Sequence, residues 1–386
     1  MSLACGLVGL PNAGKSTLFR ALTAAPAEIA PYPFTTIAPG VGVVPIPDPR
    51  LEEIARVVAP DRVVPATIEI VDIAGLVRNA HRGEGLGNQF LGRIREVDAI
   101  VHVVRCFGGH VAHVEGGLDP IRDIEIVETE LLMADLDTVQ RARAEIGPRA
   151  RTGAQAARDE DAVLAPLEAH LAAGRPARTF SAVEDAAEGH GSIAEQTTPT
   201  SRPSGPAQSG GGAVGRLHLL SSRPVLYVAN LEEAEAAGGP CLDAVTRRAQ
   251  GEGAGALGLC ARLELELSEL DPAQAAEFLG ALGLTERGLP RLARACLDLL
   301  RLRTFFSIAS REVRAWTVPA GTRAAEAAGR IHTDMERGFI RAEVVAARDL
   351  VASGSLAAAR ERGLVRLEGR AYEVQDGDVI TFRFAA

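Results

Sequence analysis

The sequence predicts a mixed α/β fold: a mostly parallel sheet covered by helices, with an inserted helical arm and a small C-terminal α+β module. Between residues 3 and 125, short apolar runs alternate with polar, helix-like stretches, which is the pattern of strand–helix–strand units. The hydrophobic period then becomes helical, and it later returns to the sheet pattern. The 386 residues are enough for two or three domains.

The sheet domain is expected at residues 1–125 and 216–303. The predicted strands are the apolar runs LACGLVGL, VGVVPIP, TIEIVDIAG, AIVHVVRC, PVLYVAN (224–230) and GALGLCA (255–261). STLFRALTAA follows the first run as a helix, and a helical stretch from Asp271 to Leu302 closes the domain. Because the pattern resumes at residue 216, the segment between the two parts is an insertion.

That insertion, residues 126–215, is predicted to be a helical arm. Residues 120–175 are rich in Ala, Glu, Asp, Arg and Leu at helical spacing, which favours a helical hairpin or coiled coil with Gly147 and Pro148 as interruptions. Residues 199–215 are rich in Ser, Gly and Pro and poor in apolar side chains. We expect them to form a disordered linker at the tip or return of the arm.

The last module is predicted at residues 304–386. EVRAWTV predicts a strand, residues 322–330 a helix, and LVRLEGRAYEVQDGDVITFRF two hairpin-like strands with a DGD turn. The only tryptophan, Trp316, is expected in the core of this module.

Composition excludes several classes of protein. Apolar residues make up 47% and charged residues 24%, which is typical of a globular chain, and no apolar run approaches the ~20 residues that span a bilayer. The net charge of −9 gives no general attraction to nucleic acid, so RNA contact would need local arginine clusters and sequence-specific DNA binding is not expected. The five cysteines are widely spaced without a CxxC pair, so we expect neither a zinc site nor a disulfide framework, and a cytoplasmic protein.

The segment GLPNAGKST matches the phosphate-binding pattern GxxxxGKS and contains Lys15, the only lysine of the chain. It follows an apolar strand and opens a helix, which is the context that the motif requires. Backbone N–H groups of residues 12 to 17 can surround phosphate oxygens at the positive end of the helix. Lys15 supplies a compact cation on a slender stem, and Ser16 a ligand for Mg²⁺. The predicted phosphate-binding residues are Asn12, Ala13, Gly14, Lys15, Ser16 and Thr17.

A second motif, DxxG, follows the strand TIEIVDIAG. Its Asp72 is expected to lie near Mg²⁺, and its Gly75 to sense the terminal phosphate. Between the two motifs, Thr35 or Thr36 can supply a second hydroxyl to Mg²⁺, and its position favours Thr36.

The residue that should orient the attacking water is missing. Where Ras-like GTPases carry a glutamine after DxxG, this chain has Leu76, which cannot hydrogen-bond to water. His113 is the first candidate to replace it and His81 the second, because both lie in glycine-flanked segments. No arginine finger is recognisable, so we expect Asn12 to hold a monovalent cation, with potassium the candidate.

The base-reading motif departs from the guanine-specific NKxD. The strand PVLYVAN ends at Asn230 and is followed by Leu231 and, two residues later, Glu233. Leu231 replaces the lysine that packs over guanine, and Glu233 replaces the shorter aspartate. Loss of the well-placed acceptor should reduce guanine selectivity by about 1–3 kcal/mol, whereas Leu231 offers an apolar plane and backbone groups for adenine.

Several segments together resemble the YchF family of Obg-like ATPases, P-loop NTPases of the TRAFAC class with a Ras-like G domain. They are GLPNAGKSTLFRAL, PYPFTTIAPGVGVVPIPDPRL, DIAGLVRNAHRGEGLGNQFL, HVVRCF and the NLEE stretch. The C-terminal segment from VRAWTVPAGTR to DGDVITFRF resembles that family's TGS domain, a β-grasp module. The resemblance covers the chain except about residues 175–220, where a Ser/Gly/Pro-rich stretch replaces a continuous helical arm.

This resemblance implies ATP hydrolysis in preference to GTP, a need for Mg²⁺, a response to potassium and association with the ribosome, for which we expect the large subunit. It assigns phosphate binding to residues 12–17, Mg²⁺ binding to Ser16 and Thr36, and adenine binding to Leu231. His113 and Lys15 are the expected catalytic residues. We expect a monomer. Two other functions stay open: a guanine-nucleotide switch with a relaxed base-reading motif, and a nucleotide-binding scaffold with negligible turnover.

Overall fold

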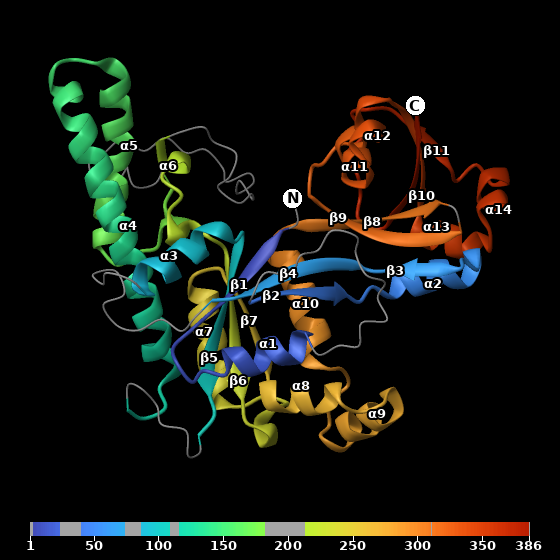
Figure 1. Cartoon of the computed structure of the whole chain (residues 1–386), viewed down its shortest axis with the longest axis horizontal. Helices are drawn as coiled ribbons and strands as arrows, with labels where there is room; N and C mark the ends of the chain where they lie inside the picture. The colour runs from blue at the N-terminus through green and yellow to red at the C-terminus, as the bar shows by residue number, and fades with distance from the viewer. Residues whose placement is uncertain are drawn as a thin grey trace, which may run out of the picture. The chain divides into compact units, whose positions relative to one another are not determined.

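The computed structural model describes residues 3–23, 40–73, 86–108, 116–181, 213–309 and 311–385. These residues divide into two compact units (Figure 1). The first unit comprises Leu3–Leu22 and Ile70–Gly288, and the second comprises Thr23–Glu69 and Leu289–Ala386.

The strands are β1 (Ala4–Val8), β2 (Val41–Ile46), β3 (Arg62–Val64), β4 (Ala66–Asp72), β5 (Ala99–Cys106), β6 (Val225–Leu231), β7 (Gly255–Leu259), β8 (Leu302–Ala309), β9 (Glu312–Pro319), β10 (Phe339–Ala346), β11 (Arg366–Glu368) and β12 (Asp378–Phe384). The helices are α1 (Lys15–Thr23), α2 (Pro49–Val58), α3 (Leu86–Glu96), α4 (Pro120–Arg151), α5 (Gln155–Ala172), α6 (Ala213–Arg216), α7 (Pro240–Gly251), α8 (Ala261–Ser268), α9 (Pro272–Ala281), α10 (Gly288–Leu299), α11 (Ala324–Ile331), α12 (Thr333–Arg337), α13 (Ala347–Ser353) and α14 (Leu356–Glu361). In the described part of the chain, short 3₁₀ turns lie at Ala177–Thr179, Leu220–Ser222 and Glu233–Glu235. Within the described residues no helix is long and apolar enough to cross a membrane.

The first sheet has the strand order β2-β4-β1-β5-β6-β7. β1 pairs with β5, β5 with β6, and β6 with β7, all in parallel. Every residue of β1, β5 and β6 is buried, as expected for strands covered on both faces. The predicted α/β fold is confirmed. Because parallel strands end at one edge, the segments after β1, β5, β6 and β7 come together there.

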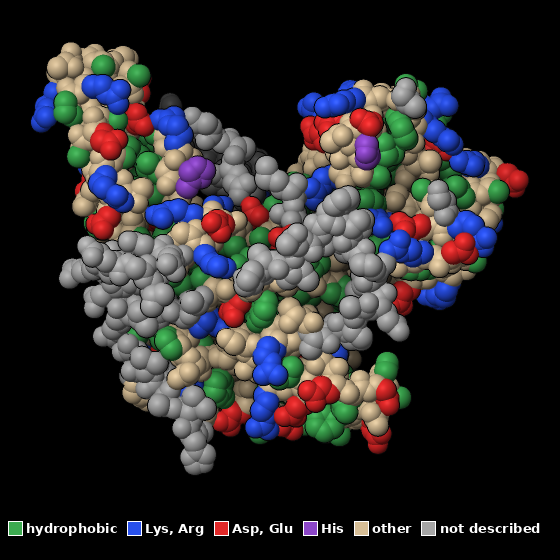
Figure 2. All heavy atoms as spheres, in the orientation of Figure 1, with side chains coloured by type: hydrophobic (Ala, Val, Ile, Leu, Met, Phe, Trp, Pro, Cys, Tyr) green, Lys and Arg blue, Asp and Glu red, His purple; other side chains and the backbone are tan. Residues whose placement is uncertain are grey.

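The helical arm is the pair α4 and α5, drawn in green in Figure 1. The helices share a buried apolar cluster that includes Val139, Leu164 and Leu167, and Arg143 joins them through Asp161 at 2.8 Å. On the face shown in Figure 2, basic and acidic side chains are interspersed over these helices.

Two expectations about the arm change. The predicted interruption at Gly147 and Pro148 is wrong, because α4 continues through both to Arg151. A proline this close to the end of a helix removes one hydrogen bond without stopping the last turn. Most of the Ser/Gly/Pro-rich segment 199–215 lies outside the described residues, and its last three residues begin α6.

The predicted single helical stretch 271–302 is two helices. Asp271 caps α9, accepting hydrogen bonds from the N–H groups of Ala273 and Gln274. Gly283, with φ +70°, lies in the gap before α10. A glycine in this conformation commonly ends a helix, which explains the break.

The second unit contains a sheet in the order β11-β10-β12-β8-β9-β3. The predicted hairpin of the last two strands is wrong: β11 and β12 both pair with β10, which lies between them. Alternation of side chains locates strands but does not choose their partners. Trp316 is half-buried rather than enclosed, stacks on Phe305 and donates a hydrogen bond to Ser307 at 2.9 Å. This separate sheet module at the C-terminal end is consistent with the β-grasp fold that we expected.

Candidate functional site

A cavity of about 1100 Å³ opens at the carboxyl edge of the first sheet. Sequence analysis selected eight of its lining residues: Asn12, Gly14, Lys15, Ser16, Thr17, Asn230, Leu231 and Glu233. It did not select the other eight: Phe107, Gly108, Glu232, Ala234, Cys260, Ala261, Arg262 and Leu282. All sixteen belong to the first unit, and the cavity is large enough for a nucleotide-sized ligand.

The loop between β1 and α1 is shaped by backbone conformations that suit small residues. Gly14 has φ +92°, and a Cβ there would lie 2.1 Å from the Asn230 side-chain nitrogen, so no other residue fits. Asn12 has φ +63°, a conformation that asparagine tolerates better than most residues. Helix α1 begins at Lys15 and directs its N-terminal amides at the cavity.

Lys15 is buried, with 7% of its surface exposed. Its Nζ donates to the backbone carbonyls of Gly9 at 2.9 Å and Leu10 at 2.8 Å. Burial lowers the Lys15 pKa to about 8, although the charge of Asp72 acts in the opposite direction. Because carbonyl dipoles do not neutralise an ammonium, this cation is ready to receive an anionic ligand.

Ser16 and Asp72 lie together beside Lys15. The Ser16 hydroxyl is hydrogen-bonded to the Asp72 carboxylate at the end of β4. Burial raises the Asp72 pKa, while Lys15 and the Ser16 hydrogen bond offset part of this rise. A hydroxyl and a carboxylate side by side are the hard oxygen donors that Mg²⁺ uses, so these residues fit the predicted metal.

Asn230 ties the phosphate loop to the base-reading side of the cavity. Its amide nitrogen donates to the Ala13 carbonyl at 2.9 Å, and its amide oxygen accepts from the Ala261 N–H at 2.9 Å. Ala13 therefore belongs to the site through its backbone, although it does not line the cavity. The buried asparagine fixes the distance between the ends of β1, β6 and β7.

Leu231 and Glu233, which replace the lysine and aspartate of NKxD, differ in burial. Leu231 is 2% exposed and belongs to the main core cluster, so its backbone is its principal contribution to the cavity wall. Glu233 starts the 3₁₀ turn after β6, lies at the rim and forms an ion pair with Arg262 at 3.4 Å. The acid at the base-reading position is thus solvated and already paired.

Six positions named from the sequence lie outside the described residues. They are Thr35, Thr36, Gly75, Leu76, His81 and His113. Their predicted roles in binding magnesium, sensing phosphate and positioning water stay predictions. The described part of the site contains the phosphate loop, Asp72 and the base-reading segment.

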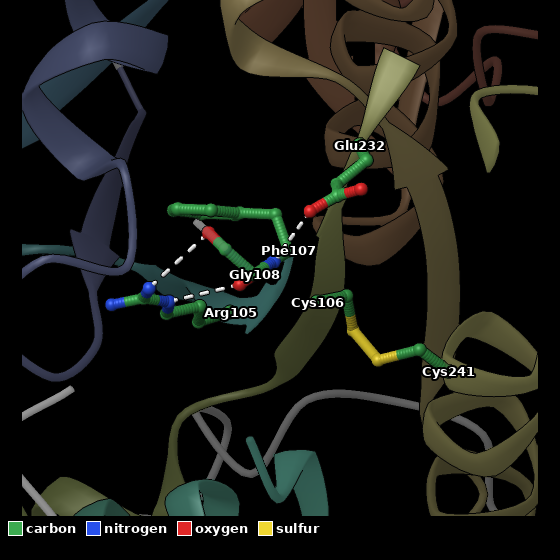
Figure 3. The surroundings of a disulfide bond; sticks show 6 residues. All are labelled: Arg105, Cys106, Phe107, Gly108, Glu232 and Cys241. Atoms are coloured by element: carbon green, nitrogen blue, oxygen red, sulfur yellow. Dashed lines mark hydrogen bonds between the residues drawn. A yellow bond between two sulfur atoms is a disulfide. The ribbon is translucent and has the colours of Figure 1, made fainter. Parts of the chain in front are cut away.

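Sequence analysis missed the wall formed after β5. The Gly108 N–H donates to Glu232 at 2.6 Å, and the Arg105 guanidinium donates to the Phe107 carbonyl at 3.1 Å (Figure 3). The signal was present, because HVVRCF ends in Phe107 at the carboxyl end of a predicted parallel strand. Such a strand end is expected at the ligand edge of the sheet.

The expectation that no disulfide forms is also wrong for one pair: Cys106 and Cys241 are bonded (Figure 3). They are 135 residues apart in sequence, so spacing gave no sign of their proximity. The pairing of β5 with β6, and the return of α7 along the same strands, bring them together. Cys5, Cys260 and Cys296 are buried and form no disulfide.

Comparison with known proteins places the chain among close relatives. A protein family described as "50S ribosome-binding GTPase" matches residues 4–136, and the YchF-GTPase C-terminal family, described as a protein of unknown function, matches residues 302–385. The chain is 45% identical over 388 residues to "Ribosome-binding ATPase YchF" of Bacillus subtilis, covering 100% of both chains. It is 45% identical to the protein of the same name from Escherichia coli O157:H7, covering 100% of this chain and 99% of that protein.

Solved structures agree with the sequence relatives. The Schizosaccharomyces pombe YchF GTPase matches with a TM-score of 0.82 at 31% identity, covering 99% of this chain and 98% of its own. A GTP-binding protein from Pyrococcus horikoshii shares the fold, with a TM-score of 0.59 at 20% identity over 99% of this chain and 100% of its own. Full-length identity, the matching fold and the nucleotide-type pocket around Lys15 agree: the chain is a P-loop protein of the YchF family.

Proposed function

We propose that this protein binds and hydrolyses ATP in preference to GTP and that its nucleotide state controls its binding to the ribosome. The observation that carries the proposal is the cavity itself. It combines a buried Lys15, whose pKa is lowered by burial despite the nearby Asp72, with a base-reading segment that has Leu231 and Glu233 where guanine-binding proteins have lysine and aspartate. The relatives from Bacillus subtilis and Escherichia coli are named ribosome-binding ATPases, which supports the same function.

In this function Lys15 holds the phosphates, because it is the buried cation at the N-terminus of α1. Nucleotide would replace the Gly9 and Leu10 carbonyls as the partner of its ammonium group. Ser16 and Thr36 would hold Mg²⁺, and Asp72 would support it through the Ser16 hydroxyl. When bound, Mg²⁺ supplies positive charge that stabilises the phosphates during transfer.

The base would meet the backbone after β6. Leu231 is enclosed in the core, so its backbone rather than a mobile side chain would face adenine. Glu233 is longer than the aspartate of NKxD and is engaged with Arg262, which weakens its use as a bidentate acceptor for guanine. A preference for ATP follows from both features.

Competitive binding tests this preference directly. Labelled ATP would be displaced by unlabelled ATP or GTP, with magnesium and potassium present. We expect GTP to compete at least about tenfold less well, in keeping with the loss of one well-placed hydrogen-bonding pair. About tenfold tighter binding of GTP would instead identify a guanine-nucleotide switch, the function that the name of the Schizosaccharomyces pombe YchF GTPase favours.

Turnover separates an ATPase from a nucleotide-binding scaffold. Single-turnover hydrolysis would be measured with and without ribosomes, in potassium and in sodium. We expect faster cleavage in potassium, with Asn12 as the candidate ligand of the monovalent cation; equal rates would remove that role. If the protein binds nucleotide but cleaves it under none of these conditions, it would be a nucleotide-binding scaffold.

The group that positions the attacking water is proposed to be His113, with His81 as the alternative. His113→Ala should slow cleavage without weakening ATP binding, and His81→Ala should change neither. The reverse result would exchange the two roles. Sedimentation with purified large subunits, with ATP or ADP bound, tests the proposed partner.

A further inference from the structure

We propose that Cys106 and Cys241 form a redox-controlled clamp on the nucleotide pocket: the disulfide holds one pocket wall in its binding position, and its reduction by a dithiol weakens nucleotide binding. The ligand in this inference rests on the proposed function, whereas the disulfide rests on the structure. The redox pair lies outside the pocket lining, so the proposal adds a modification site to the binding site.

The two cysteines belong to the two segments that flank one side of the pocket. Cys106 is the last residue of β5, and Cys241 is the second residue of α7. Their Cα atoms are 5.8 Å apart. Cys106 pairs in register with Leu231, the last residue of β6, so the bond closes a ring through the base-reading segment between β6 and α7.

The residues directly after Cys106 form the pocket wall. Phe107 and Gly108 both line the cavity, and the ring of Phe107 reaches within 3.8 Å of the position that a Cβ on Gly14 would take. A movement of Cys106 is therefore transmitted through one peptide bond to a side chain that borders the phosphate loop.

Polar contacts also hold the described part of this wall. Gly108 donates its N–H to the exposed Glu232 at 2.6 Å, and Arg105 donates to the carbonyls of Phe107 at 3.1 Å and Gly108 at 3.5 Å while lying over the Phe107 ring at 4.6 Å (Figure 3). These contacts are polar and partly solvated, so each contributes modestly. The disulfide is the one covalent link that the described residues provide between the wall and α7. Removing the disulfide should increase the number of conformations that the wall adopts, and nucleotide binding must then restrict the wall to one of them.

The burial of the two sulfurs favours attack at one of them. Cys106 is 2% exposed, whereas Cys241 is partly exposed at the start of its helix. A dithiol thiolate would attack the Cys241 sulfur, forming a mixed disulfide and releasing the Cys106 thiolate, which takes a proton from solvent. The second thiolate of the reagent then displaces Cys241. Two electrons and two protons pass to the protein, and the dithiol leaves as a cyclic disulfide.

The compartment of the proposed partners gives this bond a regulatory role. ATP hydrolysis at the ribosome takes place in the cytoplasm, where a stable structural disulfide is rare and redox-responsive disulfides predominate. A disulfide that lies beside a ligand pocket and has one accessible sulfur is better suited to reversible regulation than to permanent stabilisation of the fold.

The test begins with the disulfide in the full-length protein. After treatment with oxidised glutathione, denatured protein should show three free thiols, and dithiothreitol should raise the number to five, in line with one bonded pair and three free cysteines. Peptide mapping should find the cross-link between Cys106 and Cys241. Five thiols after oxidation, or a cross-link between other cysteines, would overturn the assignment.

The second measurement is the Kd of a fluorescent ATP analogue with Mg²⁺. Reduction of the wild-type protein should raise this Kd about 3- to 10-fold, the effect of freeing one or two wall side chains. Cys241→Ser should bind like the reduced wild type and should not respond to dithiothreitol. Cys296→Ala removes a cysteine outside both the pair and the pocket, and should keep the full response.

The outcomes separate the two proposals. A cross-linked protein whose Kd is the same before and after reduction would overturn the clamp while leaving the proposed function intact. A protein that binds no nucleotide in either state would overturn the proposed function and the ligand assigned to the clamp, while the thiol count would still report the disulfide. Because reduction of wild type needs no substitution, a folding defect in Cys241→Ser would not obscure the result.

Discussion

The first unit contains two buried clusters of charge that are satisfied in opposite ways. In the pocket, Lys15 donates to two backbone carbonyls, and burial lowers its pKa although Asp72 acts against the shift; burial raises the pKa of Asp72. For both groups burial outweighs their mutual attraction, which disfavours the two charged forms.

The second cluster lies at the root of the arm, where Glu128 on α4 meets two arginines. Arg178 donates to it at 2.5 Å, Arg248 at 2.6 Å and the Tyr227 hydroxyl at 2.8 Å. These partners lower the Glu128 pKa although burial acts against them. Glu252 also binds both arginines, so the charges balance within the protein.

The difference indicates what each cluster is for. A cluster whose charges are balanced internally fixes the position of the arm on the sheet and needs no ligand. A cluster in which one carboxylate does not offset the burial of a lysine leaves that lysine able to gain a further anionic partner from a ligand, at some cost in stability. Substitutions in the two clusters should therefore separate binding from folding.

The largest effect is expected at Lys15. Lys15→Ala should weaken ATP binding by about 100-fold or more, because a buried cation on the phosphates is lost. The free energy of unfolding should stay the same or rise, since a buried charge that Asp72 offsets only in part is removed. Isothermal titration calorimetry and urea unfolding measure the two quantities. A large loss of stability would show that Lys15 has a structural role and would contradict the proposed difference between the two clusters.

Glu128→Ala should show the opposite pattern. It leaves Arg178 and Arg248 short of a buried anion and should lower the free energy of unfolding by about 3 kcal/mol, with ATP affinity changed less than about twofold. Glu125→Ala, an exposed acid on the same helix, is the matched control and should cost less than about 0.5 kcal/mol. Equal effects of the two substitutions would contradict the balanced cluster.

The pH dependence of the pocket sharpens the comparison. With the Lys15 pKa at about 8, raising pH from 7 to 9 should weaken ATP binding by about tenfold, because the protonated form is required. Stability moves in the other direction. Between pH 8 and 10.5 the unfolded chain binds more protons at this lysine, so the Lys15 contribution to stability rises with pH.

Lys15→Ala is the control for both pH effects. In that variant the Lys15 contribution should disappear from the pH dependence of ATP affinity and from that of the free energy of unfolding. An ATP affinity of the wild type that is flat from pH 7 to 9 would show that Lys15 stays charged without ligand.

The smallest effect is expected at the rim. Glu233→Asp shortens the acid while keeping its charge, and should move the ATP-to-GTP affinity ratio toward GTP by about threefold. The expected change is small because Leu231, the other residue that departs from NKxD, stays in the core and because the acid at position 233 is partly solvated. Arg262→Ala serves as the companion, because it frees Glu233 without shortening it. A ratio unchanged in both variants would remove the rim from base selection.

Several parts of the fold and site followed directly from the sequence. The apolar runs located β1, β4, β5, β6 and β7, and the GKS motif after the first run placed Lys15 and Ser16 at a helix N-terminus. These features depend on local chemistry: alternation, strand length and the small residues of a tight loop. Pro148 was misread because a proline signal does not report its distance from the end of a helix.

The sequence by itself determined the phosphate loop, the departure from NKxD and the family, because each is carried by neighbouring residues. Only the tertiary structure decided which distant segments meet. It paired β11 with β10, brought Glu232 to Gly108, gathered Glu128 with Arg178 and Arg248, and joined Cys106 to Cys241 across 135 residues. The physical reason is that strand order and helix packing set these contacts, and neither is written in the spacing of the residues that make them.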